Sequence, residues 1–364
     1  MEPRDPVALP SRCATGSLRF GRDDDSVNLL ISRGRNVLIA VATLLLGAAA
    51  LHRFLPFPEV EHVTPKLRFF AAHQDEFDTL FIGTSRIEHH IAPEIFDRVA
   101  AEKGLPTRSF NFGIDGMHPA ESFYVVEQIL KSRPRKLKWV FFELEDVLTD
   151  WSTDARGTRR LAYWHDWKRT KQTLRRIVNP RGDARWYAEM ARAVLSRREI
   201  ALHISLFAKQ FVNLGRAGDF LENSSTEMNA QLGPRGDGYR PPGTAMQAER
   251  AARYEQKLER ETSNARPRFV DPHAEKSYRE YAAQFHKLGA ASLFVVTPVV
   301  TQSPLRLRAD PPPPGPVLAF NDRRAYPQLY GAEVRVDESH LTKAGADEFT
   351  RLIAEEFVRR VAHP

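Results

Sequence analysis

Short apolar runs alternate with longer stretches of helical periodicity between residues 78 and 144, and this alternation constrains the fold more than any other feature. The predicted strands lie at 78–83, 109–112 and 139–144, and the predicted helices between them lie at 93–103 and 119–133. Strands and helices in this order form a parallel sheet with right-handed crossovers and with helices on its faces. The sequence therefore predicts an α/β domain.

The same pattern returns near the C-terminus after a long interruption. The expected elements are a helix at 272–287, a strand at 291–297, a loop at 303–316, a short strand at 334–336 and a last helix at 343–361. The chain from 146 to 270 is arginine-rich and mostly helical in pattern. We therefore assign 78–145 and 271–364 to the α/β domain and treat 146–270 as a large helical insertion.

Residues 37–51 carry no charge and, together with the apolar residues that follow, reach the roughly 20 residues that a helix needs to cross a bilayer. A buried core helix would be amphipathic, whereas this run is apolar on all sides. A cleaved signal peptide is the other alternative, but its polar lead would be unusually long. We predict an uncleaved transmembrane signal anchor at 36–55.

Arg33 and Arg35 precede the span, so the positive-inside rule places the N-terminus in the cytoplasm. We expect a single-pass protein of the inner (cell) membrane with its α/β domain in the periplasm. The polar tail at 1–35 predicts a flexible segment, because it has little to bury. Prolines after the span predict a stiff extended stalk at 56–77.

The net charge of +7 suits an anionic partner such as a phosphate polymer, an acidic glycan or a membrane face. Nucleic acid does not fit a location outside the cytoplasm. Cys13 is the only cysteine, which leaves no disulfide framework and no cysteine nucleophile in the body of the chain. His89 and His90 are adjacent, so their side chains point in different directions and make a poor metal pair. We expect no metal and no cofactor.

Residues with catalytic chemistry follow the predicted strand ends. Ser85 comes after the first strand, Gly116 comes after the second, and Asp337 and His340 precede the last helix. In a parallel sheet these positions share the edge at which open α/β folds bind ligands. Serine acyl chemistry needs an imidazole within reach of the hydroxyl, a carboxylate that orients the imidazole, and N–H donors for the oxyanion. Each group is available at this edge.

In three blocks the chain resembles the SGNH (GDSL-type) hydrolase superfamily. The family's Gly-x-Ser block is similar to residues 83–85, its second glycine block is similar to 111–116, and its Asp-x-x-His block is similar to 337–340. The resemblance covers roughly 78–145 and 272–361. It implies a flavodoxin-like three-layer sandwich around a parallel sheet.

The resemblance also implies a role for each matching residue. Ser85 would be the nucleophile, His340 the general base and then the general acid, and Asp337 the partner that orients His340. The backbone N–H groups of Ser85 and Gly116 would form the oxyanion hole. The N-terminal anchor and the large insertion resemble membrane-bound members that transfer acyl groups in the cell envelope, such as the D-alanyl transfer protein of teichoic acid synthesis and the alginate acetylation proteins.

One block departs from the family. The third block, Gly-x-Asn-Asp, adds an Asn side chain to the oxyanion hole, whereas residues 143–147 read Glu-Leu-Glu-Asp-Val and contain no Asn. Losing one oxyanion donor typically costs about 2.7 to 4 kcal/mol of barrier. Glu143 and Glu145 share one face of a strand and are either an acid/base pair or structural carboxylates.

Two further residues beside these blocks are candidates for substrate binding. Arg86 follows the nucleophile and holds either an anionic substrate or a neighbouring carboxylate, and Asn111 opens the second block. The tryptophans of the insertion would either stack on sugars or cover the sheet edge. They are Trp151, Trp164, Trp167 and Trp186.

The leading prediction is a membrane-anchored esterase or O-acyltransferase that acts on acyl esters of an envelope glycan or lipid through an acyl-serine. Its partners would be the inner membrane, an acylated polysaccharide or lipid and, for transfer, an acyl-donor protein of the membrane. The alternative is a glycan-binding or envelope assembly protein that keeps the fold without turnover. Hydrolase and transferase share the first half-reaction, so the residues do not separate these two activities.

Overall fold

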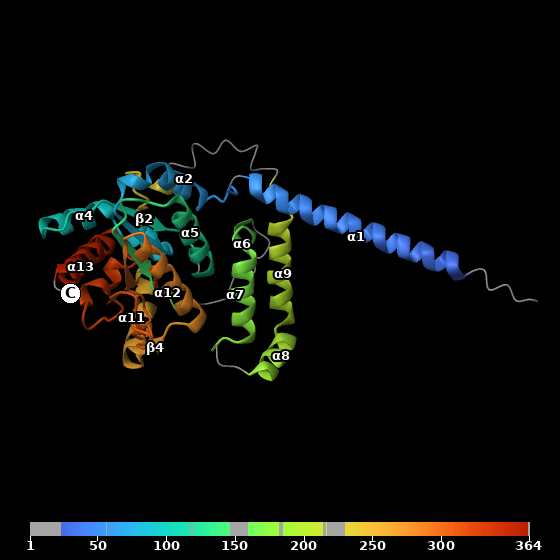
Figure 1. Cartoon of the computed structure of the whole chain (residues 1–364). Helices are drawn as coiled ribbons and strands as arrows, with labels where there is room; N and C mark the ends of the chain where they lie inside the picture. Colours follow the sequence, from blue (N-terminus) through green and yellow to red (C-terminus); the bar gives the residue numbers. More distant parts are fainter. Residues whose placement is uncertain are drawn as a thin grey trace, which may run out of the picture. The chain divides into compact units, whose positions relative to one another are not determined.

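The computed structural model describes residues 23–55, 57–117, 119–145, 159–181, 185–213, 216 and 230–362. The chain separates into two compact units, Met1–Phe54 and Leu55–Pro364. The first unit contains one long helix, α1 (Asp23–Phe54), shown in blue in Figure 1. Its segment Ile31–Phe54 is long and apolar enough to cross a membrane, as predicted.

The helix α1 begins earlier than the sequence pattern indicated. Residues 23–35, predicted to be part of a flexible tail, are helical. Cys13 and the rest of the predicted tail lie outside the described residues.

The second unit is built on a five-stranded parallel sheet in the order β2-β1-β3-β5-β7, which confirms the predicted α/β class. The strands are β1 (Thr79–Gly83), β2 (Ser109–Gly113), β3 (Trp139–Glu143), β5 (Ala291–Val296) and β7 (Val317–Ala319). Thr79 pairs with Ser109 on one side and with Trp139 on the other. The strand order reverses between β1 and β3, and their carboxyl ends therefore border the crevice at which such sheets bind ligands.

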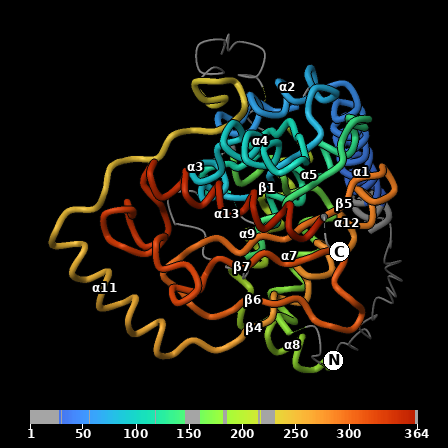
Figure 2. The backbone as a smooth tube through the Cα atoms, turned by 90° about the vertical axis from the view of Figure 1, so that its left-hand side faces the viewer, coloured from blue at the N-terminus to red at the C-terminus, as the bar shows by residue number. Residues whose placement is uncertain are grey.

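Helices cover both faces of the sheet (Figures 1 and 2). One face carries α2 (Thr64–His73), α5 (Pro119–Ser132) and α12 (Pro272–Lys287), and the other carries α3 (Ser85–His90), α4 (Pro93–Glu102) and α13 (Lys343–Ala362). Successive residues of β1 serve the two faces in turn, since Leu80 and Ile82 join one buried cluster and Phe81 joins the other. A strand buried on both faces needs an uninterrupted apolar run, which is the signal in the sequence.

The predicted stalk at 56–77 is wrong for most of its length. Residues 64–73 form α2 and residues 74–76 form a 3₁₀ turn. Val63, Leu67 and Phe70 follow helical spacing and lie buried in the core of the domain. Pro65, a residue that suggested an extended chain, occupies the first turn of the helix, where a missing N–H costs nothing.

The predicted strand at 334–336 is also wrong. Residues 332–334 form a 3₁₀ turn, and Arg335 makes a single bridge with Leu341. The fifth strand is instead β7, which directly follows the proline-rich stretch. The predicted loop at 303–316 contains a two-residue strand, β6 (Leu305–Arg306), that pairs with β4 (Arg268–Phe269). Strands of two or three residues are too short to show an alternating apolar pattern in the sequence. They are recognised only by their backbone pairing with a neighbouring strand.

The described part of the insertion is mainly helical, as predicted. Its helices are α6 (Arg159–Ala162), α7 (Trp167–Val178), α8 (Trp186–Leu195), α9 (Arg197–Phe211) and α11 (Ala248–Ser263). Trp164 is fully buried in the core, whereas Trp167 and Trp186 are exposed and Trp151 lies outside the described residues. The backbone N–H of Asn111 on edge strand β2 donates to Asp237 O at 2.8 Å, so the insertion covers that edge.

Phe70→Ala tests whether α2 belongs to the domain. Phe70 is 1% exposed and packs against the rings of Phe77, Phe110 and Phe112. Truncating a buried Phe typically costs about 3 to 5 kcal/mol, so the free energy of unfolding in urea titrations should fall by that amount. Arg68→Ala, on the exposed side of α2, is the control and should cost less than about 1 kcal/mol. Equal losses of unfolding free energy for the two substitutions would indicate that residues 64–73 are a stalk and not part of the domain.

Candidate active site

The chain turns from β1 into α3 at the carboxyl edge of the sheet, and Ser85 is the first residue of α3. Thr84 caps the helix, because its Oγ1 accepts the N–H of Arg86 at 3.2 Å. The neighbouring strand end requires Gly113, since a Cβ there would lie 2.1 Å from the backbone nitrogen of Glu88. This close approach lets α3 sit directly against β2.

Ser85, His340 and Asp337, which we call the triad, form one chain of hydrogen bonds. The Ser85 Oγ lies 2.8 Å from His340 Nε2, although 255 residues separate the two. The Nδ1 of His340 lies 2.9 Å from Asp337 Oδ2 and 3.0 Å from Oδ1. With its proton on Nδ1, the imidazole donates to the carboxylate and leaves Nε2 free to accept the serine proton.

The carboxylate of Asp337 is held in its charged form. Partial burial alone would raise its pKa, but hydrogen bonds from the His340 ring and from two backbone N–H groups outweigh that effect and lower the pKa to about 2. The N–H groups of Ser339 and His340 donate to Oδ1 at 2.7 and 2.8 Å. An aspartate that stays anionic at neutral pH can both orient a histidine and stabilise its protonated form.

Arg335 fixes the loop that carries Asp337 and His340. Its buried guanidinium donates to Pro298 O and Glu338 O, each at 3.0 Å. It also lies over the rings of Tyr254 and Tyr330. This role of Arg335 was not predicted, because its segment has a strand-like pattern and its partners come from distant parts of the chain.

His90 fixes the other end of the same loop. Its Nε2 accepts the N–H of Leu341 at 3.0 Å, and its side chain is fully buried. Burial, followed by the nearby His340, lowers the pKa of His90 well below its ordinary value. The ring is therefore neutral at physiological pH, which the acceptor role requires. His90 thus fixes the backbone at the end of the loop 337–340.

The two backbone donors expected for an oxyanion are arranged at adjacent strand ends. Gly116 has a φ of +63°, in the left-handed region that favours glycine, and lies in the turn after β2. The N–H of Ile114 donates to Gly83 O at 3.0 Å and ties this turn to the end of β1. Within the described ranges, the N–H groups of Ser85 and Gly116 have no protein acceptor. They are thus available to a ligand.

Glu143 occupies the position at which the third block would begin. Its buried carboxylate accepts the N–H of Thr84 at 2.7 Å and the hydroxyl of Thr297 at 3.1 Å. Arg86 Nε lies 2.7 Å from the same carboxylate, and the guanidinium also pairs with Glu145. Glu143 therefore holds the turn before Ser85, and Arg86 is engaged by neighbouring carboxylates rather than left free for an anionic substrate. Asp146 and Val147 lie outside the described residues.

Asn111 is not placed for substrate binding, contrary to the expectation. Its side chain is fully buried, and Nδ2 donates to the carbonyls of Ile87 and Ile91, each at 2.7 Å. Its Oδ1 accepts the N–H of Gly113 at 2.8 Å. Asn111 therefore satisfies the backbone at the end of α3 and fixes that helix on β2.

A buried ammonium lies behind α3. Lys66 of α2 donates to Glu88 Oε1 at 3.1 Å, Gly113 O at 2.5 Å and Gly238 O at 2.8 Å. Burial lowers the pKa of Lys66 to about 8, although the attraction of Glu88 opposes this shift. One side chain thus joins α2, α3, the end of β2 and the insertion.

A cleft of about 500 Å³ opens beside the triad. Its lining comes from the loop 337–340 and from Met246, Arg250, Arg253 and Tyr254 at or near the start of α11. Arg250 and Arg253 are exposed, and neither has a carboxylate partner among the described residues. Arg250 and Arg253 carry no signal in the sequence, because nothing in an arginine-rich insertion distinguishes these two from the arginines on solvated faces.

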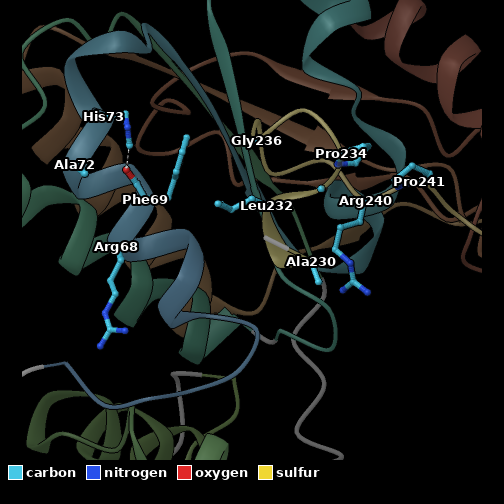
Figure 3. Close-up of a pocket in the computed structure, with 11 residues that line it drawn as sticks. Arg68, Phe69, Ala72, His73, Ala230, Leu232, Pro234, Gly236, Arg240 and Pro241 are labelled. Carbon is cyan, nitrogen blue, oxygen red and sulfur yellow. Dashed lines mark hydrogen bonds between the residues drawn. The ribbon is translucent and has the colours of Figure 1, made fainter. Parts of the chain in front are cut away.

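A larger pocket of about 990 Å³ lies between α2 and residues 230–241 (Figure 3). Its wall includes Phe69, Leu232 and Pro234, and His73 Nδ1 lies 2.8 Å from Phe69 O. None of its lining residues belongs to the triad. The smaller cleft is the better candidate for substrate, because Asp337 and His340 of the triad line it.

No family model matches the chain, and no characterised protein matches it in sequence. The functional interpretation therefore depends on geometry and on the chemistry of the residues.

Glu143→Gln should separate a structural carboxylate from an acid/base residue. Loss of this buried charge removes one of the two carboxylate partners of Arg86 and weakens the bond to Thr84 N–H, so we expect the free energy of unfolding to fall by about 1 to 3 kcal/mol. Glu145→Gln, which leaves Glu143 in place, is the matched control and should cost less, because Glu145 is less buried than Glu143. An unchanged unfolding curve for Glu143→Gln would contradict the structural role.

Proposed function

We propose that the chain is a membrane-anchored, SGNH-like serine enzyme that makes or breaks acyl esters on an envelope glycan or lipid. The observation that carries the proposal is the hydrogen-bonded Ser85–His340–Asp337 array at the carboxyl edge of a parallel sheet. A serine hydroxyl 2.8 Å from an imidazole nitrogen has the geometry of an activated nucleophile.

The reaction follows from these contacts. Ser85 Oγ attacks the acyl carbonyl while its proton moves to His340 Nε2, and Asp337 stabilises the imidazolium that forms. The oxyanion of the tetrahedral intermediate is bound by the N–H groups of Ser85 and Gly116. Collapse of the intermediate breaks the ester bond, and the leaving alcohol takes the proton from His340. Water or a sugar hydroxyl then attacks the acyl-serine, again with His340 as base.

The resemblance to SGNH enzymes supports this assignment at three places. Ser85 follows the first strand of the sheet, Gly116 follows the second, and Asp337 and His340 share the loop before the last helix. The strand order agrees with the flavodoxin-like order of a three-layer sandwich. The strand order and the three motifs both support the proposal.

The resemblance to SGNH enzymes fails at residues 143–147, where the family has an Asn that donates to the oxyanion. The carboxylate of Glu143 is engaged by Thr84 and Arg86 and accepts hydrogen bonds, so it cannot donate one to an oxyanion when it is ionised. Two backbone N–H groups are then the only donors that we assign. This feature favours the second candidate function, a glycan-binding or assembly protein without turnover. Covalent labelling of Ser85 distinguishes the two.

The location is part of the proposal. We infer that α1 spans the inner membrane with its N-terminus in the cytoplasm and that the α/β domain is periplasmic. Substrate would then be an acylated polysaccharide or lipid of the envelope, and an acyl-donor protein in the same membrane would supply the acyl group for transfer.

Ser85→Ala should abolish covalent labelling by a serine-reactive fluorophosphonate and release of the acyl group from short aryl esters. Ser339→Ala is the control, because Ser339 lines the same cleft without contact to His340 Nε2. It should retain both signals. Labelling that persists in Ser85→Ala, or that is absent from the wild-type chain, would exclude the acyl-serine route and favour the binding function.

Arg250→Gln and Arg253→Gln test whether the cleft recognises negative charge. A hydrogen bond to a charged group contributes about 1.5 to 3 kcal/mol, so each variant should raise KM for an anionic aryl ester at least about tenfold. Hydrolysis of a neutral aryl ester should be unchanged. Arg260→Gln, farther along α11 and outside this cleft, is the control. Parallel changes for both esters would show that the arginines do not select charge.

A further inference from the structure

Helix α8 in the insertion carries large apolar side chains on its exposed face. Trp186 is 76% exposed, Met190 60% and Val194 63%, and their spacing of four residues puts them on one stripe. Tyr187 and Leu195 are 56% and 85% exposed beside the stripe or at the end of the helix. Few large apolar side chains elsewhere in the described domain are as exposed. We call this surface the α8 face, and its exposed apolar area indicates an interaction site.

A helix on the surface of a soluble domain normally buries its apolar side and exposes its polar side, and α8 does the reverse. The helix packs against α7 and α9 (Figure 1). Its inward side includes Glu189, which is half-buried and accepts a hydrogen bond from Asn179 Nδ2 at 2.9 Å. A polar contact thus faces the protein while Trp, Tyr, Met and Val face outward. Rotation to bury the apolar stripe would break this contact.

Exposed basic residues flank the α8 face. Arg185 precedes the helix, and Arg197 and Arg198 follow it. None of the three has a carboxylate partner among the residues that the structure describes. Two copies of the face would bring these like charges together, which opposes self-association. An anionic surface would neutralise them.

We infer that the α8 face binds the headgroup region of an anionic lipid bilayer. Trp and Tyr favour this region because their rings are apolar and their N–H or O–H groups remain hydrated. Arg side chains interact with lipid phosphates while the Met, Val and Leu side chains enter the acyl boundary. The interaction holds the domain against the membrane at the insertion and is independent of whether Ser85 forms an acyl-enzyme.

The test uses the full chain in lipid nanodiscs, with Cys13→Ser and a single new cysteine labelled by an environment-sensitive fluorophore. The probe positions are Met190→Cys on the α8 face, Val194→Cys as a second site on the same stripe, and Ala101→Cys at an exposed position of α4 as the control. α4 and α8 lie far apart in both views of the domain (Figures 1 and 2).

In nanodiscs of phosphatidylcholine and phosphatidylglycerol, spin-labelled lipid should quench the probes at 190 and 194. Aqueous iodide should quench these two probes at least about fivefold less than it quenches the probe at 101. Pure phosphatidylcholine, or Arg197→Gln with Arg198→Gln, should weaken both effects. Iodide access equal to that at position 101 would overturn the inference. Shielding without quenching by lipid, found only with two copies per nanodisc, would overturn it in favour of a protein contact.

Discussion

The candidate site depends on one buried interaction, the contact of Lys66 with Glu88 and two backbone carbonyls. A lysine removed from water is costly unless its three donors are satisfied, and here each finds an oxygen. Those oxygens belong to α3, the end of β2 and the insertion. The same interaction that neutralises the cost of burial therefore fixes the helix that begins with Ser85, and it makes α2 part of the domain rather than a spacer.

The opposite side of the site is built in a similar way. Arg335 and His90 bind backbone atoms of the loop 337–340, so the positions of Asp337 and His340 are set by groups that do not take part in the proposed reaction. Glu143 holds the turn before Ser85 from a third direction. Preorganisation of this kind avoids reorganisation during the reaction, which is the main source of electrostatic catalysis. It also explains how a site with fewer assigned oxyanion donors can remain well ordered.

Much of the fold was predictable, because strands buried on both faces and amphipathic helices leave periodic patterns. β1, β2, β3 and β5 and the helices between them appear where those patterns are. β7 and α2 were missed for opposite reasons: three residues cannot show a period, and prolines at the start of a helix resemble those of an extended linker. Ser85 was predicted from its place after β1, and Asp337 and His340 were predicted from their place before the last helix. Lys66, Arg335, Arg250 and Arg253 carry no local signal.

The sequence by itself determined the α/β class, the long apolar helix and the chemical groups available at the carboxyl edge of the sheet, because each depends on local pattern and on the rule that parallel strands end at a common edge. Only the tertiary structure decided which polar and charged side chains are used within the protein and which line the cleft. Arg86 and Asn111 adjoin the nucleophile or its sequence blocks but are used within the protein. Arg250 and Arg253 are distant in sequence but line the cleft, since packing rather than sequence distance sets which groups a ligand can reach.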